Sequence, residues 1–310
     1  MNDIANNPSA GSRLGLVQAL LACLFWGVMP IYFKLLEDVA AIEVVAHRVI
    51  WTVPLLLVIL YFRKNITGLL SSWADKKIRW TLLASSLLIA ANWLIYVWAV
   101  QEDHILAASL GYFISPLLSV FLGRIFLKET LSRNQWVAVG IAALGVSVLA
   151  VEAWQTLWIS LALAASWSGY ALVRKVADVG PIVGLTIETS VLLPFFGLFL
   201  LWVSFGSGYS ADTVHLGDSL PIDILLLGGA VVTAAPLMLF ASAVKKMTLS
   251  AIGLLNYLAP TLQFLIGVMI YREPLTISHI ICFGLIWISL AIFSADSIRK
   301  ERTRRTELAI

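Results

Sequence analysis

Two charged residues lie inside apolar runs where a membrane-spanning segment would not tolerate a free charge. Arg48 lies in VAHRVIWTVP (residues 45–54), and Glu188 lies in GLTIETSVLLP (residues 184–194). Charged groups are costly in hydrocarbon, so both side chains should point into a helix bundle or a water-filled cavity. The guanidinium of Arg48 could bind a substrate carboxylate or phosphate, and a structural ion pair is the alternative. Glu188 is the candidate for proton coupling, because a desolvated carboxylate can exchange protons during a conformational cycle.

Polar side chains recur at helical spacing in three other apolar runs. These stripes comprise Asn92 with Tyr96, Tyr112 with Ser115 and Ser119, and Asn256 with Gln263. Residues at such spacings share one face of a helix. We expect them to line a central substrate-binding cavity, although interhelical hydrogen bonds would explain any single one. Trp26 and Trp167 could add stacking surfaces for a substrate, with interface anchoring or core packing as the alternative.

Four further residues are expected to have structural or gating roles. Glu43 and His47 are four residues apart and predict a local pair near one end of their segment. Pro116 and Pro260 lie within apolar runs, so each should interrupt the backbone hydrogen bonds of its helix. The result would be either a static kink or a bend that shapes the cavity.

The sequence lacks the motifs of several common activities. It contains neither a Walker glycine loop nor HExxH, and no motif spacing joins His47, Ser115 and Glu188 into a catalytic set. Cys23 and Cys282 fall inside apolar runs and predict packing roles. The net charge of +3 comes from dispersed basic residues, so we expect no nucleic-acid partner. No enzyme activity, cofactor or metal is expected.

The composition identifies the elements that must position these residues. Hydrophobic residues make up 60% of the 310 residues, charged residues make up 13%, and the mean hydropathy is +0.92. Soluble domains carry about 25% charged residues, so this composition indicates an all-α integral membrane protein whose partner is the lipid bilayer. A helix needs about 20 apolar residues to cross the bilayer, which predicts ten spans. They cover residues 14–36, 43–62, 80–101, 105–127, 134–151, 156–173, 182–203, 221–243, 251–271 and 278–295.

The positions of the basic residues test the predicted number of spans. If alternate connections and both tails face the cytoplasm, 18 of the 21 Lys and Arg residues lie there, and the opposite loops are short or acidic. One missed span would destroy this alternation. The sequence therefore predicts a multi-pass protein of a bacterial inner membrane with both termini cytoplasmic. Its parts would be a tail (1–13), two five-helix units (14–151 and 152–295) and a basic tail (296–310).

The two units are related by an internal repeat. A shift of 144 positions aligns AASLGYFISPLLSVFLGRIFLKETL (107–131) with AIGLLNYLAPTLQFLIGVMIYREPL (251–275), so that Pro116 meets Pro260 and Glu129 meets Glu273. Each unit has an odd number of spans, so the repeats must be inverted in the membrane. Inverted repeats are typical of carriers that alternate between two states around a midplane site.

Six segments resemble a known family. FWGVMPIYFKLL, AHRVIW, NWLIYVWAV, ASLGYFISPL, YALVRK and LAPTLQFLIGV together resemble the RarD group of the EamA family, in the drug/metabolite transporter superfamily. The resemblance extends from Leu14 to Ser294 and implies two EamA repeats of five helices. It also implies a secondary carrier or exporter of small metabolites or drugs. Ala107 and Ser115 stand where the family pattern has a carboxylate and an amide, which could alter ligand preference.

The sequence therefore predicts a secondary active transporter with a central site for a small-molecule substrate. Small metabolites, amino-acid-like compounds and drugs are the expected substrates, and coupling to protons is the expected driving force. A flippase of lipid-linked substrates and a membrane sensor or structural protein are the alternatives. The small residues of AVGIAALG (138–145) could mediate dimerisation or close packing within one bundle, so monomer and homodimer both stay open.

Overall fold

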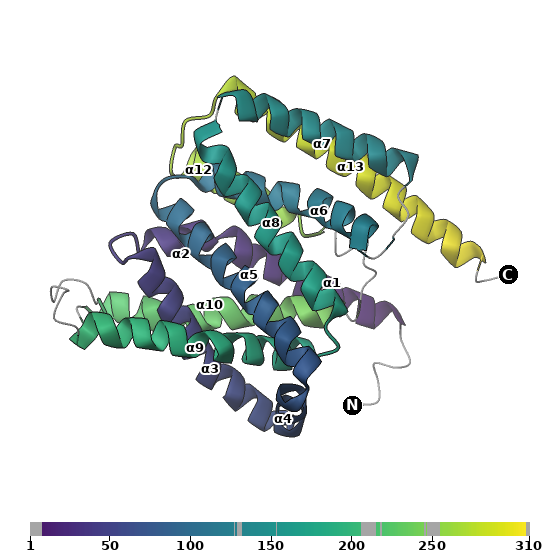
Figure 1. Ribbon diagram of the computed structural model, residues 1–310. Helices are drawn as coiled ribbons and strands as arrows, with labels where there is room; N and C mark the ends of the chain where they lie inside the picture. The colour runs from purple at the N-terminus through teal and green to yellow at the C-terminus, as the bar shows by residue number, and fades with distance from the viewer. Residues whose placement is uncertain are drawn as a thin grey trace.

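The computed structural model describes residues 8–126, 128, 132–152, 154–205, 215–217, 219–244, 246 and 255–307. All regular secondary structure in these ranges is helical, as the apolar runs predict (Figure 1). The first half contains α1 (Pro8–Gly27), α2 (Met29–Lys34), α3 (Ala41–Phe62), α4 (Ile66–Ala74), α5 (Lys76–Gln101), α6 (Ile105–Phe126) and α7 (Arg133–Glu152). The second half contains α8 (Trp154–Val176), α9 (Pro181–Phe205), α10 (Leu220–Val244), α12 (Leu258–Met269) and α13 (Ile277–Glu307).

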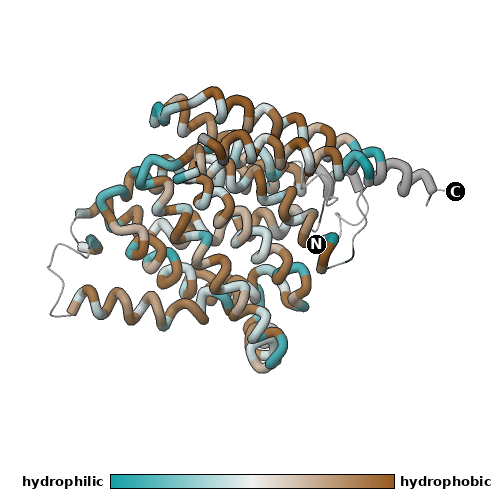
Figure 2. Tube along the Cα trace, turned by 45° about the horizontal axis from the view of Figure 1, so that its top comes forward, coloured by the Kyte–Doolittle hydropathy of each residue, from teal (hydrophilic) through white to brown (hydrophobic). Residues whose placement is uncertain are grey.

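The helices fit the predicted ten-span pattern. Within the described ranges, eight are long and apolar enough to cross a membrane, with α1 and α2 counted together as one span. The other two predicted spans coincide with α7 and the shorter α12. Apolar residues run along most of the helix lengths (Figure 2). Large apolar side chains such as Phe195, Leu198 and Trp202 of α9 are exposed outside the bundle, as expected for surfaces that face lipid.

Some predicted boundaries differ from the structure. The first span is broken at Val28, and α2 begins with Pro30 close to its start, where a missing backbone N–H removes no helix hydrogen bond. The short α4 lies in the connection between the second and third spans and was not predicted. The last helix continues beyond residue 295 to Glu307, so much of the predicted basic tail is helical.

The two repeat-related prolines occupy different helix positions. Pro116 lies inside α6, as predicted. Pro260, in contrast, is in the first turn of α12, which begins at Leu258. The first backbone N–H groups of a helix have no intrahelical partner, so a proline there interrupts nothing. Within the described residues, Pro260 therefore lies at the start of a helix, and the part of its predicted span at residues 251–254 lies outside the described residues.

The packing of the helices has the two-fold arrangement that the repeat requires. Helices that hold the same place in the two halves pack against each other: α3 on α9, α6 on α12, and α7 on α13. The contact of α5 with α8 likewise matches that of α10 with α1. With five spans in each half, an axis that relates them lies in the membrane plane. The fold is therefore two inverted five-helix repeats.

The outermost pair, α7 and α13, lies side by side along most of its length (Figure 1). A Cβ at Gly145 of α7 would lie 3.1 Å from the carbonyl oxygen of Cys282 on α13, so glycine permits this close approach. Gly140, in the same stretch of small residues, has no such neighbour. Gly145 therefore serves packing within the bundle.

Candidate functional site

Arg48 is a buried charge without an acidic partner. It lies on α3, and its side chain is only 3% exposed. Its Nε donates to Thr233 Oγ1 of α10 at 2.9 Å. No carboxylate in the described ranges lies within ion-pair distance of this guanidinium. The structural ion pair considered for Arg48 is therefore not formed by the described residues.

Aromatic rings and a close helix contact hold Arg48 in place. The guanidinium carbon lies 4.8 Å from the ring centroid of Trp93 and 5.2 Å from that of Phe33. Such cation–π contacts are attractive and strengthen when the site is dry. The aliphatic stem packs against Gly229 of α10, where a Cβ would lie 2.9 Å from Arg48 Cγ. The guanidinium of Arg48 therefore lies between α3 and α10, and Gly229 leaves space for its aliphatic stem.

Glu188 on α9, by contrast, is fully paired. This buried carboxylate accepts hydrogen bonds from Ser85 Oγ at 2.5 Å and from Tyr170 OH at 3.2 Å. Arg174 Nε lies 3.7 Å from Glu188 Oε1. These three partners were missed by sequence reasoning, which placed Arg174 in a cytoplasmic connection. The structure places it in the last turn of α8, four residues after Tyr170, and that spacing was the available signal.

The two charges occupy related places in the two halves. Arg48 lies on the second spanning helix of its half and contacts a hydroxyl on α10, the third spanning helix of the other half. Glu188 lies on the second spanning helix of its half and contacts a hydroxyl on α5, also the third of the other half. The inverted repeat therefore provides one positively and one negatively charged half-site.

A continuous series of aromatic rings joins the two half-sites. We call it the aromatic column; it comprises Phe33, Tyr96, Tyr112, Trp167 and Tyr170. Successive ring centroids are separated by 5.8, 5.5, 6.0 and 5.8 Å. Its first ring lies under the Arg48 guanidinium, and the hydroxyl of its last ring donates to Glu188. Three predicted site residues, Tyr96, Tyr112 and Trp167, are thus brought together.

The other predicted polar residues surround this column or lie elsewhere. Asn92 is fully engaged: it donates to Ser166 Oγ at 3.0 Å and accepts from Tyr112 OH at 2.9 Å, which ties α5 to α6 and α8. Ser115 donates to the carbonyl of Gly111 within α6. The hydrogen bonds of Asn92 are of the interhelical kind considered as the alternative to lining a cavity, whereas that of Ser115 stays within its own helix.

Trp26 and the α12 region lie at the side of the column. The Trp26 ring is 6.2 Å from that of Trp167, and its backbone carbonyl accepts from Gln263 Nε2 at 2.9 Å. Gln263 Oε1 is buried without a hydrogen-bond partner, and so is Asn256 Oδ1, just before α12. These two amide oxygens are acceptors with no donor from the described residues.

Glu43 and His47 form the predicted pair, but a third residue dominates it. His47 Nε2 is 3.7 Å from Glu43 Oε1, which is too long for a hydrogen bond. Glu43 instead accepts from the backbone N–H of His215 and contacts its Nδ1, both at 2.9 Å. The pair lies in the first two turns of α3 and holds the segment before α10, consistent with a structural role.

Neither of the two described hollows lies at the column. One, of about 160 Å³, is lined by Leu69, Leu70, Trp73, Ile187 and Ser190. The other, of about 270 Å³, is lined by Ala41, Ile42, Leu94, Ile95, Trp98 and Trp158. Both are largely apolar and contain no candidate residue. The rings of the column contact one another directly, so a substrate that enters between two of them must separate them.

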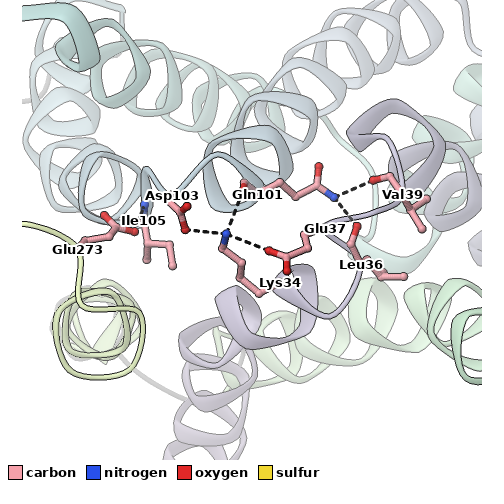
Figure 3. A network of polar contacts seen from close by, with 8 residues as sticks. All are labelled: Lys34, Leu36, Glu37, Val39, Gln101, Asp103, Ile105 and Glu273. Carbon is pink, nitrogen blue, oxygen red and sulfur yellow. Dashed lines mark hydrogen bonds and ion pairs between the residues drawn. The ribbon is translucent and has the colours of Figure 1, made fainter.

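A polar network joins connections between helices at one end of the bundle (Figure 3). We call it the end network; it comprises Lys34, Glu37, Gln101, Asp103 and Glu273. Lys34 Nζ lies 2.6 Å from Asp103 and 3.2 Å from Glu37, and it donates to the carbonyl of Gln101 at 3.0 Å. The Gln101 amide donates in turn to the backbone carbonyls of Leu36 and Val39. The α2–α3 and α5–α6 connections are thereby joined.

Glu273 adds the α12–α13 connection to this end. Its carboxylate accepts from the backbone N–H groups of Ile105 at 2.7 Å and Leu106 at 2.9 Å, the first residues of α6. Burial raises the pKa of Glu273 to about 7, and these two donors act in the opposite direction. Apart from Glu273, noted through its repeat partner, the sequence analysis assigned no role to this network.

Comparison with known proteins adds the family. The model of the EamA-like transporter family matches this chain twice, over residues 13–151 and 154–295. The chain belongs to the EamA-like transporter family. Within the described ranges, eight helices are long and apolar enough to span a membrane, and α12 is a shorter apolar helix. The chain is therefore a multi-pass membrane transporter of the drug/metabolite transporter superfamily.

Individual EamA relatives match over almost their whole length. An uncharacterized transporter of Vibrio cholerae is 37% identical over 297 residues, which cover 95% of this chain and 96% of that protein. The protein RarD of Escherichia coli (strain K12) is 38% identical over 292 residues, covering 94% and 97%. A protein of known crystal structure shares the fold, with a TM-score of 0.57 at 18% identity over 93% of this chain.

Proposed function

We propose that this EamA protein is a secondary active transporter that carries a small-molecule substrate across the bacterial inner membrane by alternating access. The observation that carries the proposal is the pair of opposite charges, Arg48 and Glu188, on the equivalent helices α3 and α9. These helices pack on each other across the two halves. Exchange of conformation between the halves would expose the aromatic column to each side in turn.

Glu188 is the proposed proton-coupling residue. Its charge is balanced by Arg174, and its oxygens are held by Ser85 and Tyr170. Protonation would remove the charge that attracts Arg174 and so weaken the contact of α9 with α8. A proton gradient can in this way bias the relative stability of the two states, as a ligand with different affinity for each would do. An ion gradient is the proposed driving force.

The topology is part of the same proposal. The basic residues concentrate in alternate connections and in both tails, which supports a cytoplasmic location for both termini. The end network would then close the periplasmic side, because it joins connections that follow an odd number of spans. We accordingly propose that the described conformation is closed on that side.

Flux into proteoliposomes tests this function. The purified protein would be reconstituted and assayed with labelled amino acids, small carboxylates, other metabolites and chloramphenicol, with and without an imposed pH gradient. Saturable flux that the gradient increases is the expected result. Glu188→Gln should lose the dependence on the gradient, while the matched control Glu102→Gln, at an exposed position after α5, should keep it. Absence of flux for every compound, with folded protein, would contradict the proposal.

A further inference from the structure

The charge of Arg48 lacks compensation in the described conformation. Its Nε is used by Thr233, and the other N–H groups of the guanidinium donate to no described residue. A buried charge without a counter-ion is strongly unfavourable, so proteins pair it or bind a ligand to it. Cation–π contacts with Phe33 and Trp93 offset only part of this desolvation. The site therefore favours a ligand that brings a negative charge.

Two hydroxyl groups near Arg48 are also unused. Tyr96 OH and Thr52 Oγ1 are buried and have no hydrogen-bond partner among the described residues. The Tyr96 ring contacts Phe33, the ring that lies under the guanidinium, and Thr52 is one helical turn after Arg48 on α3. Buried hydroxyl groups are normally hydrogen-bonded, because an unmade bond there costs about 1–3 kcal/mol. An oxyanion bound to the guanidinium could accept from one or both.

The charges nearby limit this anion to a single negative charge. The other buried or half-buried cations of the central helices are already paired: Lys34 with Asp103, and Arg174 with Glu188. A phosphate would introduce a second negative charge, and the buried cations Lys34 and Arg174 already face carboxylates. The carboxylates are paired as well, Glu43 with His215 and Glu188 with Arg174, so a ligand ammonium group would find no free counter-ion.

The side chains around Arg48 favour a ligand whose uncharged part is a flat ring. Trp93, Phe33, Tyr96 and Tyr112 present ring faces and edges beside the guanidinium. Aromatic pairs stack or meet edge to face at the distances seen in the column, and they contribute beyond simple burial of area. A flat ring could replace one ring–ring contact of the column without exposing the others to water.

We propose that the substrate of this site is a small aromatic carboxylate without an ammonium group. Its carboxylate accepts hydrogen bonds from the Arg48 guanidinium and Tyr96 OH, and its ring lies among Trp93, Phe33 and Tyr112. This inference rests on the proposed transport function, since it names the substrate class of the same site.

Equilibrium binding to the protein in lipid nanodiscs tests the substrate class. The probes are 3-phenylpropanoate, its uncharged amide, hexanoate, phenylalanine and phenyl phosphate. We expect 3-phenylpropanoate to bind at least about tenfold more tightly than each of the others, because each lacks the single charge or the ring, or adds an unpaired charge. Equal or tighter binding of the amide, phenylalanine or phenyl phosphate would overturn the inference.

Variants of Tyr96 and Arg48 test ligand recognition apart from any effect on folding. Tyr96→Phe removes only the unused hydroxyl, so we expect about a three- to tenfold loss of affinity for 3-phenylpropanoate. The matched control Tyr61→Phe removes a hydroxyl from an exposed ring at the end of α3 and should change nothing. Arg48→Lys should retain part of the preference for the carboxylate over the amide, and Arg48→Gln should abolish it. A preference that survives in Arg48→Gln would refute the assignment.

Flux measurements distinguish a failure of this inference from a failure of the proposed transport function. Saturable transport of other compounds, with no binding of 3-phenylpropanoate, would leave the transporter in place and remove the aromatic carboxylate. Binding of 3-phenylpropanoate without flux of any compound would retain the anion site and contradict transport.

Discussion

Arg48 and Glu188 show two different solutions to placing a charge in a membrane interior. Glu188 has an ion-pair partner and two hydroxyl donors, so its charge is balanced within the protein. Arg48 has one hydroxyl and two aromatic rings, and no residue in the described part of the chain supplies an anion to it. We infer that the first arrangement serves stability and coupling, whereas the second serves binding. Natural proteins commonly accept some loss of stability at a binding site.

Replacing Arg174 tests whether this residue balances the charge of Glu188. In Arg174→Gln, Glu188 keeps its hydroxyl donors but loses its cation, and breaking such a buried pair costs about 3 kcal/mol. We expect a clear fall in the unfolding temperature, measured by nanoscale fluorimetry in detergent. The double variant Arg174→Gln with Glu188→Gln should recover much of this loss, because no charge is then unpaired. Equal destabilisation of the single and double variants would show that the ion pair is unimportant.

At the scale of elements, the connections at one end act together. Lys34 joins the α2–α3 and α5–α6 connections, and Glu273 holds the first turn of α6 from the α12–α13 connection. A carboxylate at a helix start is favourable because free N–H groups point toward it. These contacts must break before a substrate could pass at this end. The end network is therefore the element that we expect to change most between states.

The raised pKa of Glu273 predicts that the stability of the folded protein depends on pH through this residue. Burial raises the folded-state pKa from the usual 4.5 to about 7, so the folded protein favours the protonated carboxyl group. The resulting stabilisation is complete below about pH 4.5 and is lost as the pH rises through about 7. Asp103 raises this pKa further, and Lys34 lowers it.

The Glu273→Gln variant removes this titration. We expect the unfolding temperature of the wild type to fall more between about pH 5 and about pH 8 than that of Glu273→Gln. Parallel pH profiles in the two proteins would exclude Glu273 as the group responsible.

The sequence predicted the elements better than their contacts. Spans follow from apolar length, and the inverted repeat follows from matches such as Pro116 with Pro260. Neither signal shows which side chains meet, so Thr233 and Ser85 could not be identified as partners of the two charges. Arg174 was not recognised as the partner of Glu188 because a basic residue just after a predicted span reads as part of a loop, whereas α8 extends to Val176. Position within a helix also decided the role of Pro260, and spacing alone could not reveal it.

For the whole molecule, the inverted halves constrain the topology. With ten spans, both termini must lie on the same side, and the basic connections predict that this side is the cytoplasm. A fluorescent protein fused after residue 310 should therefore fluoresce in bacterial cells, and alkaline phosphatase fused there should be inactive. The opposite pattern would reverse the assignment and place the end network on the cytoplasmic side.

The central claim is that the charge of Arg48 binds a ligand and is not needed for the stability of the fold. Thermal unfolding of wild type and Arg48→Gln, each with and without 3-phenylpropanoate, tests this most directly. We predict that Arg48→Gln is at least as stable as the wild type without ligand, because it removes an uncompensated charge. We also predict that the ligand stabilises only the wild type, by mass action on the folded state. A variant that is much less stable than the wild type, or one that the ligand stabilises equally, would contradict the account.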